Sequence, residues 1–283
     1  MSSIVASTMS PYRASAPLTP QWQHFDYTVD DGVATVTLNR PEKLNALTFD
    51  VYADLRDLVT ELPQRGEARV LVITGKGRGF SSGGDVEEII APLLEMETVE
   101  LLGFTRMTGG VVKAMRECPL PIIAAINGVA AGAGSVIALA SDLRLMAESA
   151  SFAFLFTRVG LAGADMGSAY LLPRIVGLGR ATELLLLGDR LSAERAFQIG
   201  LATQVVADDA LEEATEGLAR RLADGPAFAF STTKSLLTRE LDMGLGAAIE
   251  LEAITQALLM QSDDFEEFYV AWSEGRRPEW KGR

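Results

Sequence analysis

The chain has 283 residues, of which 48% are apolar and 7% aromatic, so it can bury a sizeable core in one or two α/β domains. Its formal net charge of −13 argues against a general nucleic-acid-binding surface, which requires a basic face. One cysteine, Cys118, and one histidine, His24, exclude an internal disulfide, a cysteine-based zinc cluster and a multi-histidine metal site.

The N-terminal residues 1–20 are rich in Ser, Thr, Ala and Pro without periodicity and are predicted to form a flexible tail. They lack the basic, apolar and small-residue regions of a secretory signal. No apolar stretch in the chain reaches the roughly 20 residues that a membrane span needs. We therefore expect a cytoplasmic protein that does not associate with membranes.

Strands and helices alternate along the first half of the chain. Residues 33–38 alternate apolar and polar side chains in the manner of a strand, and Thr48 is a plausible N-cap for a helix with apolar spacing over 48–62. Further strands are predicted at 70–73, 121–126, 143–146 and 151–154. Further helices are predicted at 86–117 (with breaks near Pro92 and Gly109-Gly110), 133–140, 167–176, 179–187, 192–199, 210–223, 227–242 and 246–272. The pattern predicts βαβ units with a largely parallel sheet in a core over 21–205, followed by a helical region over 206–283.

Three glycine-rich segments bring the backbone close to a neighbour. Residues 75–79 follow a strand but lack the spacing of a dinucleotide loop or a P-loop. Residues 80–86 and 127–135 both lie where a strand gives way to a helix. Amides at a helix start have no internal partner and carry partial positive charge, so two of them aimed at one point would stabilise an oxyanion. Alternatively, these glycines only permit tight turns and close packing.

Several motifs together resemble the crotonase superfamily, the enoyl-CoA hydratase/isomerase family. They are Asn39-Arg-Pro-Glu-Lys-Leu-Asn-Ala46, Phe80-Ser-Ser-Gly-Gly-Asp85, Pro121-Ile-Ile-Ala-Ala-Ile-Asn-Gly128, Ala140-Ser-Asp142, Leu172-Pro-Arg-Ile-Val-Gly177 and Gly188-Asp-Arg-Leu-Ser-Ala193. The resemblance implies an α/β fold, a crotonase-type spiral of ββα units with a C-terminal helical region. It also implies an acyl-CoA thioester as ligand, no metal or redox cofactor, coenzyme A only as part of the substrate, and a homotrimer or hexamer.

The resemblance places the two oxyanion-binding amides at Gly84 and Ala133. It assigns acyl-CoA binding to Arg40, Lys43, Leu44, Ala46, Ser82, Asp85, Val86, Val136 and Phe156. Arg40, Lys43 and Lys76 could meet the phosphates, or they are solvated surface charges. Asp85 is expected to shape its loop. The basic end, residues 276–283, could reach a phosphate or stay solvated.

The acid/base residues depart from the family pattern. The two glutamates of hydratases in this family fall on Val136 and Phe156, so two-carboxylate addition of water does not carry over. Asp165, eight residues before Pro173, matches a position where other branches carry an active aspartate, and we expect it to act as acid/base or nucleophile. Alternatively, Asp165 only caps the following helix. Glu87 and Glu88 are second candidates, or they lie on a solvated helix face.

Other functions compete with an isomerase or lyase acting on a cyclic or aromatic acyl-CoA. A two-glutamate type of enoyl-CoA hydratase and a catalytically silent acyl-CoA-binding relative both remain open. A serine hydrolase built on Ser135 would need His24 as its base, and His24 lies near the N-terminal tail. The apolar spacing over 246–272 fits an interface helix or packing against the chain's own core.

Overall fold

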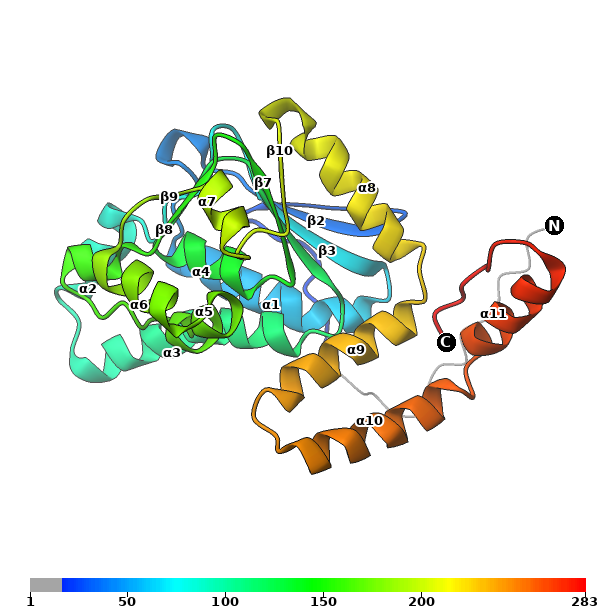
Figure 1. Ribbon diagram of the computed structural model, residues 1–283. Helices are drawn as coiled ribbons and strands as arrows, with labels where there is room; N and C mark the ends of the chain where they lie inside the picture. Colours follow the sequence, from blue (N-terminus) through cyan, green and yellow to red (C-terminus); the bar gives the residue numbers. More distant parts are fainter. Residues whose placement is uncertain (1–16) are drawn as a thin grey trace.

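Two β-sheets organise the core of the chain, which the computed structural model describes from residue 17 to residue 283 (Figure 1). The larger sheet has the order β1-β2-β3-β5-β7-β10 and the smaller one β4-β6-β8-β9. The strands are β1 (Asp26–Asp30), β2 (Gly32–Leu38), β3 (Ala68–Gly75), β4 (Gly79–Ser81), β5 (Ile122–Ile126), β6 (Val129–Ala131), β7 (Leu143–Ala147), β8 (Ser151–Ala153), β9 (Leu191–Ser192) and β10 (Gln204–Val206).

From β3 to β8, consecutive strands alternate between the two sheets. β3, β5 and β7 pair in parallel in the larger sheet, while β4, β6 and β8 pair in parallel in the smaller one. Antiparallel pairing is confined to the edges, β1 with β2 and β8 with β9. Each turn of the chain thus adds one strand to each sheet before a helix follows, which confirms the expected α/β spiral of ββα units.

Helices surround the two sheets and form the C-terminal part of the chain (Figure 1). They are α1 (Phe49–Arg65), α2 (Ala91–Leu93), α3 (Thr98–Glu117), α4 (Ala133–Ala140), α5 (Ser168–Val176), α6 (Leu178–Leu187), α7 (Ala193–Gln198), α8 (Leu211–Ala223), α9 (Ala227–Glu240), α10 (Leu245–Leu259) and α11 (Asp263–Glu274). Short 3₁₀ turns occur at Pro41–Lys43, Leu155–Val159 and Asp208–Ala210, and a π turn occurs at Val86–Ile90. In the described part of the chain, none of the helices is long and apolar enough to cross a bilayer.

The long elements were predicted and several short ones were not. Thr48 caps α1 as expected, its hydroxyl accepting from the Val51 amide at 3.3 Å. Residues 86–117 break at 94–97 rather than at Gly109-Gly110, which lie inside α3 because Thr98–Glu117 keeps a continuous buried stripe. The single helical region expected over 246–272 is two helices, since Ser262 caps α11 by accepting from the Phe265 amide. The brief strands β1, β4, β6, β9 and β10 carry too little alternation to be recognised.

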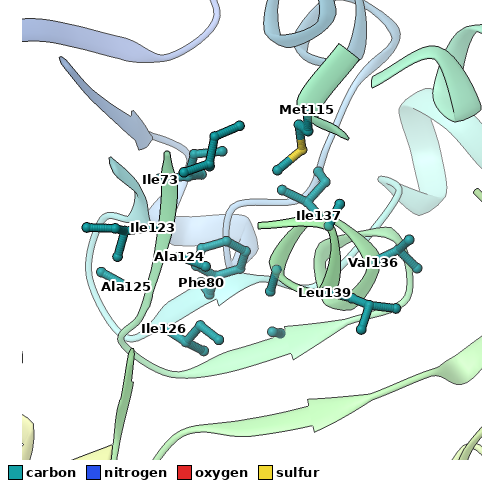
Figure 2. Close-up of a cluster of buried hydrophobic side chains, with 14 of the residues drawn as sticks. Ile73, Phe80, Met115, Ile123, Ala124, Ala125, Ile126, Val136, Ile137 and Leu139 are labelled. Atoms are coloured by element: carbon teal, nitrogen blue, oxygen red, sulfur yellow. The ribbon is translucent and has the colours of Figure 1, made fainter. Parts of the chain in front are cut away.

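The main core lies between the two sheets and helices α1, α3 and α4. Figure 2 shows Ile137 pointing from α4 toward Met115 of α3, with Phe80 beside Ala124. Phe80, Ile137 and Met115 are all sealed from solvent. Burial of these apolar side chains holds α4 against the sheets and so fixes the loop that precedes it.

The C-terminal helices join the core through a buried ion pair. Lys234 of α9, with 7% of its side chain exposed, places Nζ 2.7 Å from Asp142 Oδ2 and 2.8 Å from the Leu120 carbonyl oxygen. Arg116 Nη1 contacts the other oxygen of Asp142 at 2.9 Å. Beyond α9, helices α10 and α11 extend to one side of the sheets (Figure 1).

Replacing Lys234 by Met is expected to lower the free energy of unfolding by about 3 kcal/mol, because it leaves a largely buried carboxylate short of one cation. Arg116 and the Ile122 amide still contact Asp142, which keeps the loss below complete unfolding. Urea unfolding measures the change. Lys113→Met on the exposed side of α3 is the control and should stay within about 0.5 kcal/mol. Equal stability of the two variants would contradict this role of Lys234.

The basic C-terminal end folds back onto α11. Arg276 pairs with Glu267 and Glu274, and the Lys281 amide donates to Asp264 Oδ1 at 2.6 Å. The side chain of Arg283 pairs with Asp263 at 3.0 Å. The charges of Arg276 and Arg283 are therefore paired with acids of the C-terminal part itself.

Candidate active site

The two glycine-rich segments singled out from the sequence meet in space. A Cβ placed on Gly83 would lie 3.4 Å from the Ala133 nitrogen and 3.0 Å from the Ala131 carbonyl oxygen. Gly132 faces the same neighbour, because its Cβ would lie 3.8 Å from the Gly83 Cα. The loop after β4 and the start of α4 are thus packed backbone to backbone.

Two amides at this meeting point are left free within residues 17–283. The neighbours of Gly84 are engaged, since the Leu47 amide donates to the Gly83 carbonyl at 2.8 Å and the Asp85 amide to the Leu47 carbonyl at 2.9 Å. The N–H groups of Gly84 and Ala133 donate to no described residue. Ala133 is the first residue of α4, whose N-terminal end carries partial positive charge. The pair is therefore suited to bind an oxygen atom that gains negative charge.

Glycines in these segments allow close backbone packing while the Gly84 and Ala133 amides stay free of partners among the described residues. A Cβ on Gly134 would lie 2.6 Å from the Ser81 carbonyl oxygen, so only glycine lets α4 approach β4 this closely. Gly75 and Gly128 are just as confined, each with a Cβ position 2.2 Å from a carbonyl oxygen. The segment 75–79 thus forms a tight turn in which Gly75 packs against the Gly79 and Phe80 carbonyl groups.

Asp165 lies in the loop before α5, half-buried. Its Oδ1 accepts from the adjacent Met166 amide at 2.8 Å, and its own amide donates to the Ser168 hydroxyl. The N-cap of α5 is Gly167, and no side chain caps that helix. Burial raises the pKa of Asp165, against the smaller lowering effect of the Met166 amide. The surroundings therefore hold the pKa of the carboxyl group above that of an exposed aspartate, a shift that suits a group that transfers protons.

Tyr52 of α1 links Asp165 to the glycine loops. Its hydroxyl lies 3.9 Å from the position of a Cβ on Gly84. Burial, and then the nearby charge of Asp165, raises the pKa of Tyr52. Asp165 is therefore close enough for its charge to act on the Tyr52 phenol, whose hydroxyl lies beside Gly84. This residue was missed from the sequence, because an apolar stripe on α1 explains Tyr52 equally well.

Arg40 and Lys43, which were expected to bind phosphate groups, form ion pairs with acidic side chains. Arg40 Nη1 lies 3.0 Å and Lys43 Nζ 3.2 Å from Asp85 Oδ2, and Lys43 also reaches Glu87 at 3.1 Å. Asp85 Oδ1 accepts from the Glu87 and Glu88 amides. The Glu88 amide, followed by Lys43 and the Glu87 amide, lowers the pKa of Asp85 to about 2 against the opposing effect of burial. Asp85 thus caps the 86–90 turn as a permanent anion.

The remaining sequence-predicted residues fall into two groups. Leu44, Ala46 and Ser82 line the loop that crosses β4, with the Ser82 amide donating to the Leu44 carbonyl at 2.9 Å. Asn45, not singled out from the sequence, fastens this loop by donating to the Lys76 and Gly79 carbonyls at 3.0 and 2.7 Å.

The apolar positions differ in exposure. Val86 is 71% exposed, whereas Phe156 is buried and Val136 is fully sealed from solvent. Figure 2 shows Val136 on the side of α4 that points away from Phe80. Glu87 and Glu88 are on the solvent side of their turn and pair with Lys43 and Arg40. Lys76 lies 3.9 Å from Asp26, at a surface ion pair.

Ser135 is not arranged as a nucleophile. It is fully buried, and its hydroxyl donates to the Gly132 carbonyl at 2.6 Å. His24 instead contacts Asp54 at 2.7 Å, at the surface. A serine hydrolase needs these two side chains in contact, so the site does not support that function.

A cleft of about 530 Å³ lies elsewhere, between the outer face of the larger sheet and α8. Thr35, Thr37 and Thr74 line its floor, and Glu212 and Glu216 its rim. It contains neither of the free amides nor Asp165. The candidate active site is therefore defined by the convergence of reactive groups and not by this cleft.

Comparisons with known proteins show which family the chain resembles over nearly its whole length. A family model described as enoyl-CoA hydratase/isomerase matches residues 28–283. A probable enoyl-CoA hydratase of Rhodobacter capsulatus is 40% identical over 91% of this chain and 97% of its own length. The 1,2-epoxyphenylacetyl-CoA isomerase of Escherichia coli is 38% identical over 90% of this chain and 97% of its own length.

Solved structures give the same result. A crystal structure of a protein assigned as an enoyl-CoA hydratase from Streptomyces coelicolor A3(2) is 61% identical and superposes with a TM-score of 0.94. The match covers 97% of this chain and all of that one. The chain therefore belongs to the enoyl-CoA hydratase/isomerase family, within the crotonase superfamily.

Proposed function

We propose that the protein binds an acyl-CoA thioester with its carbonyl oxygen between the Gly84 and Ala133 amides and stabilises the enolate formed there. The observation that carries this proposal is the pair of free amides presented by adjacent loops. Named relatives act on acyl-CoA or acyl-carrier-protein thioesters, including the trans-2-decenoyl-[acyl-carrier-protein] isomerase of Streptococcus mutans at 31% identity.

Asp165 is proposed as the acid/base of this reaction. Its ionised carboxylate takes a proton from a carbon next to the thioester or conjugated with it, and the C–H electron pair moves onto the thioester oxygen. The two amides stabilise the resulting oxyanion. The protonated Asp165 then returns the proton to another carbon, which shifts the double bond with no gain or loss of atoms. A second route open to the same group is attack of the carboxylate on a substrate carbon that bears a leaving group. The leaving group departs with the electron pair of the broken bond, and water then hydrolyses the ester to regenerate the carboxylate.

Isomerase chemistry is favoured over hydration because water addition calls for an acid and a base at separate positions. The two glutamate positions hold Val136 and Phe156, neither of which transfers a proton. Phe156, which keeps 7% of its surface exposed, is an apolar ring that suits a cyclic or aromatic acyl group, whereas Val136 is sealed from solvent. A two-glutamate type of hydratase and a silent acyl-CoA-binding protein are the alternatives.

Hydration of crotonyl-CoA, followed by loss of its conjugated enone absorbance, separates these functions. We expect binding of this thioester without appreciable hydration, together with turnover of a cyclic or aromatic enoyl-CoA. Rapid hydration would establish the hydratase alternative instead. Binding across a panel of thioesters with no turnover of any would establish the silent relative.

Lys43 pairs with Glu87 in the structure. We propose that Lys43 leaves Glu87 and contacts a phosphate when the thioester binds. Lys43→Met is expected to raise the Kd for an acyl-CoA by about 5-fold, the effect of one exposed charge contact. Calorimetry at two salt concentrations should show a weaker salt dependence in this variant. Lys113→Met, which removes an exposed lysine from α3, is the matched control and should bind as the unaltered protein does. Equal Kd values for both variants would contradict the role of Lys43.

A trimer, or a pair of trimers, is proposed for the assembly. Helix α10 has no buried residue, and Leu245, Ile249, Ile254 and Leu258 are each more than half exposed. Such a face is covered when subunits associate. Sedimentation equilibrium tests this, since a single species at the chain mass of 30.3 kDa would contradict it.

A further inference from the structure

Tyr52 places a polar group in an apolar part of the candidate site. The side chain is 2% exposed, and its ring packs edge-on against Phe104 at 6.2 Å between centroids. Ile89, which also contacts the Cβ position of Gly84, is 1% exposed. The hydroxyl is the part of Tyr52 that reaches the Gly84 loop.

This hydroxyl makes no hydrogen bond with any residue in the range 17–283. By contrast, two tyrosine hydroxyls of this range have partners: Tyr27 donates to Glu67, and Tyr170 donates to Asp242. Several polar atoms of this range lack a partner and are also sealed from solvent, but the Tyr52 oxygen is not one of them. The hydroxyl therefore opens onto accessible space. Tyrosine hydroxyls that are buried in this way usually have a partner, so the missing partner is expected to come from a ligand.

The chemistry of the neighbours decides what this partner is. Tyr52 stays protonated, because its surroundings disfavour the phenolate, and so it offers a hydrogen-bond donor. A ligand oxygen accepts such a bond, whereas a hydrocarbon chain leaves the donor unsatisfied. Because the hydroxyl lies beside Gly84, the accepting atom lies close to the thioester carbonyl that Gly84 is proposed to bind.

We infer that Tyr52 is a specificity-determining residue whose hydroxyl donates a hydrogen bond to an oxygen of the acyl chain close to the thioester carbonyl, so the site prefers oxygenated acyl-CoA thioesters over plain hydrocarbon ones. This inference rests on the proposed function of the site. Through Tyr52 the site would select for an oxygen atom in the acyl group, which the apolar side chains of Val136 and Phe156 cannot do.

The test is a pair of thioesters that differ by one oxygen, 3-oxobutanoyl-CoA and butanoyl-CoA, with the unaltered protein and Tyr52→Phe. Phenylalanine keeps the ring that packs on Phe104 and removes only the hydroxyl. The unaltered protein should bind the oxo compound about 10-fold more tightly, as one good hydrogen bond implies. Tyr52→Phe should lose that preference, with the Kd of butanoyl-CoA changing less than about 2-fold.

Tyr27→Phe is the matched control, since it removes a hydroxyl from β1 that pairs with Glu67 away from the loops. Its two Kd values should equal those of the unaltered protein. An equal effect of Tyr52→Phe on both thioesters, or no effect on either, would overturn the inference while leaving the proposed function intact. Failure of the unaltered protein to bind either thioester would overturn both. Thermal melting of the variants confirms that each is folded.

Discussion

Asp165→Asn is expected to lower turnover of the true substrate by about 10²–10⁴-fold, the usual contribution of a positioned acid/base. Asparagine retains an oxygen that can accept from the Met166 amide, so the loop before α5 should keep its shape. Single-turnover kinetics with saturating thioester measure the chemical step apart from binding. Turnover close to that of the unaltered protein would remove Asp165 from the mechanism.

The same substitution is expected to leave stability at neutral pH unchanged or slightly increased. Burial raises the pKa of Asp165 above that of an exposed aspartate. Its contribution to stability is therefore complete below the unfolded-state pKa and is lost as the pH rises through the folded-state pKa. At neutral pH the ionised group opposes folding, and asparagine removes that charge.

The dependence of kcat/KM on pH should also report the raised pKa of Asp165. If the ionised carboxylate is the base, kcat/KM falls as the pH drops through a pKa that lies above the ordinary aspartate range. Asp57→Asn, on the half-exposed side of α1, is the matched control. It should change neither kcat/KM nor the fall of kcat/KM at low pH. A variant at Asp165 that loses activity only because it unfolds would contradict the assignment, and urea unfolding decides this.

Gly134→Ala is expected to lower turnover by about 10²–10³-fold, as does loss of one oxyanion donor. The new methyl group would lie 2.6 Å from the Ser81 carbonyl oxygen and 2.7 Å from the Ser81 Cβ, so α4 must move away from β4. That movement shifts the Ala133 amide relative to Gly84. Overpacking at this site should also cost about 1–3 kcal/mol of stability.

Gly109→Ala is the matched control because the same methyl group enters open space on helix α3. It should stabilise the protein by about 0.5–1 kcal/mol, since alanine favours a helix over glycine. Thermal unfolding and thioester turnover measured on both variants separate the effect of crowding from the effect of a lost glycine. Full activity of Gly134→Ala would show that the placement of the Ala133 amide is not needed.

Much of the fold follows from local patterns in the sequence. The alternation over 33–38 and the apolar spacing over 48–62 predicted β2 and α1, because a buried face imposes those periods. The strands β4 and β6 have three residues each and were not found, since their register depends on the neighbouring loops. The spiral itself was expected from the resemblance and not from these periods.

The site was predicted in part. The two glycine segments were identified from their place between strands and helices, and the structure brings them into contact. Tyr52 and Asn45 were not identified as site residues. Tyr52 looks like a core residue of its helix. Asn45 acts through the carbonyl groups of a loop about 30 residues away in sequence and through the nearby Arg40 amide. Such roles depend on tertiary contacts that no local pattern records.

The groups proposed to hold the thioester oxygen are main-chain amides, and this has a consequence for how such a protein can change. Any residue except proline supplies an N–H, so substitutions at positions 84 and 133 rarely delete the donor itself. Side chains around it are free to vary, and a carboxyl group can be lost at one place and gained at another. Enolate stabilisation can thus be inherited unchanged while the fate of the enolate diverges, and the reaction of each member is then decided by where its ionisable side chains lie.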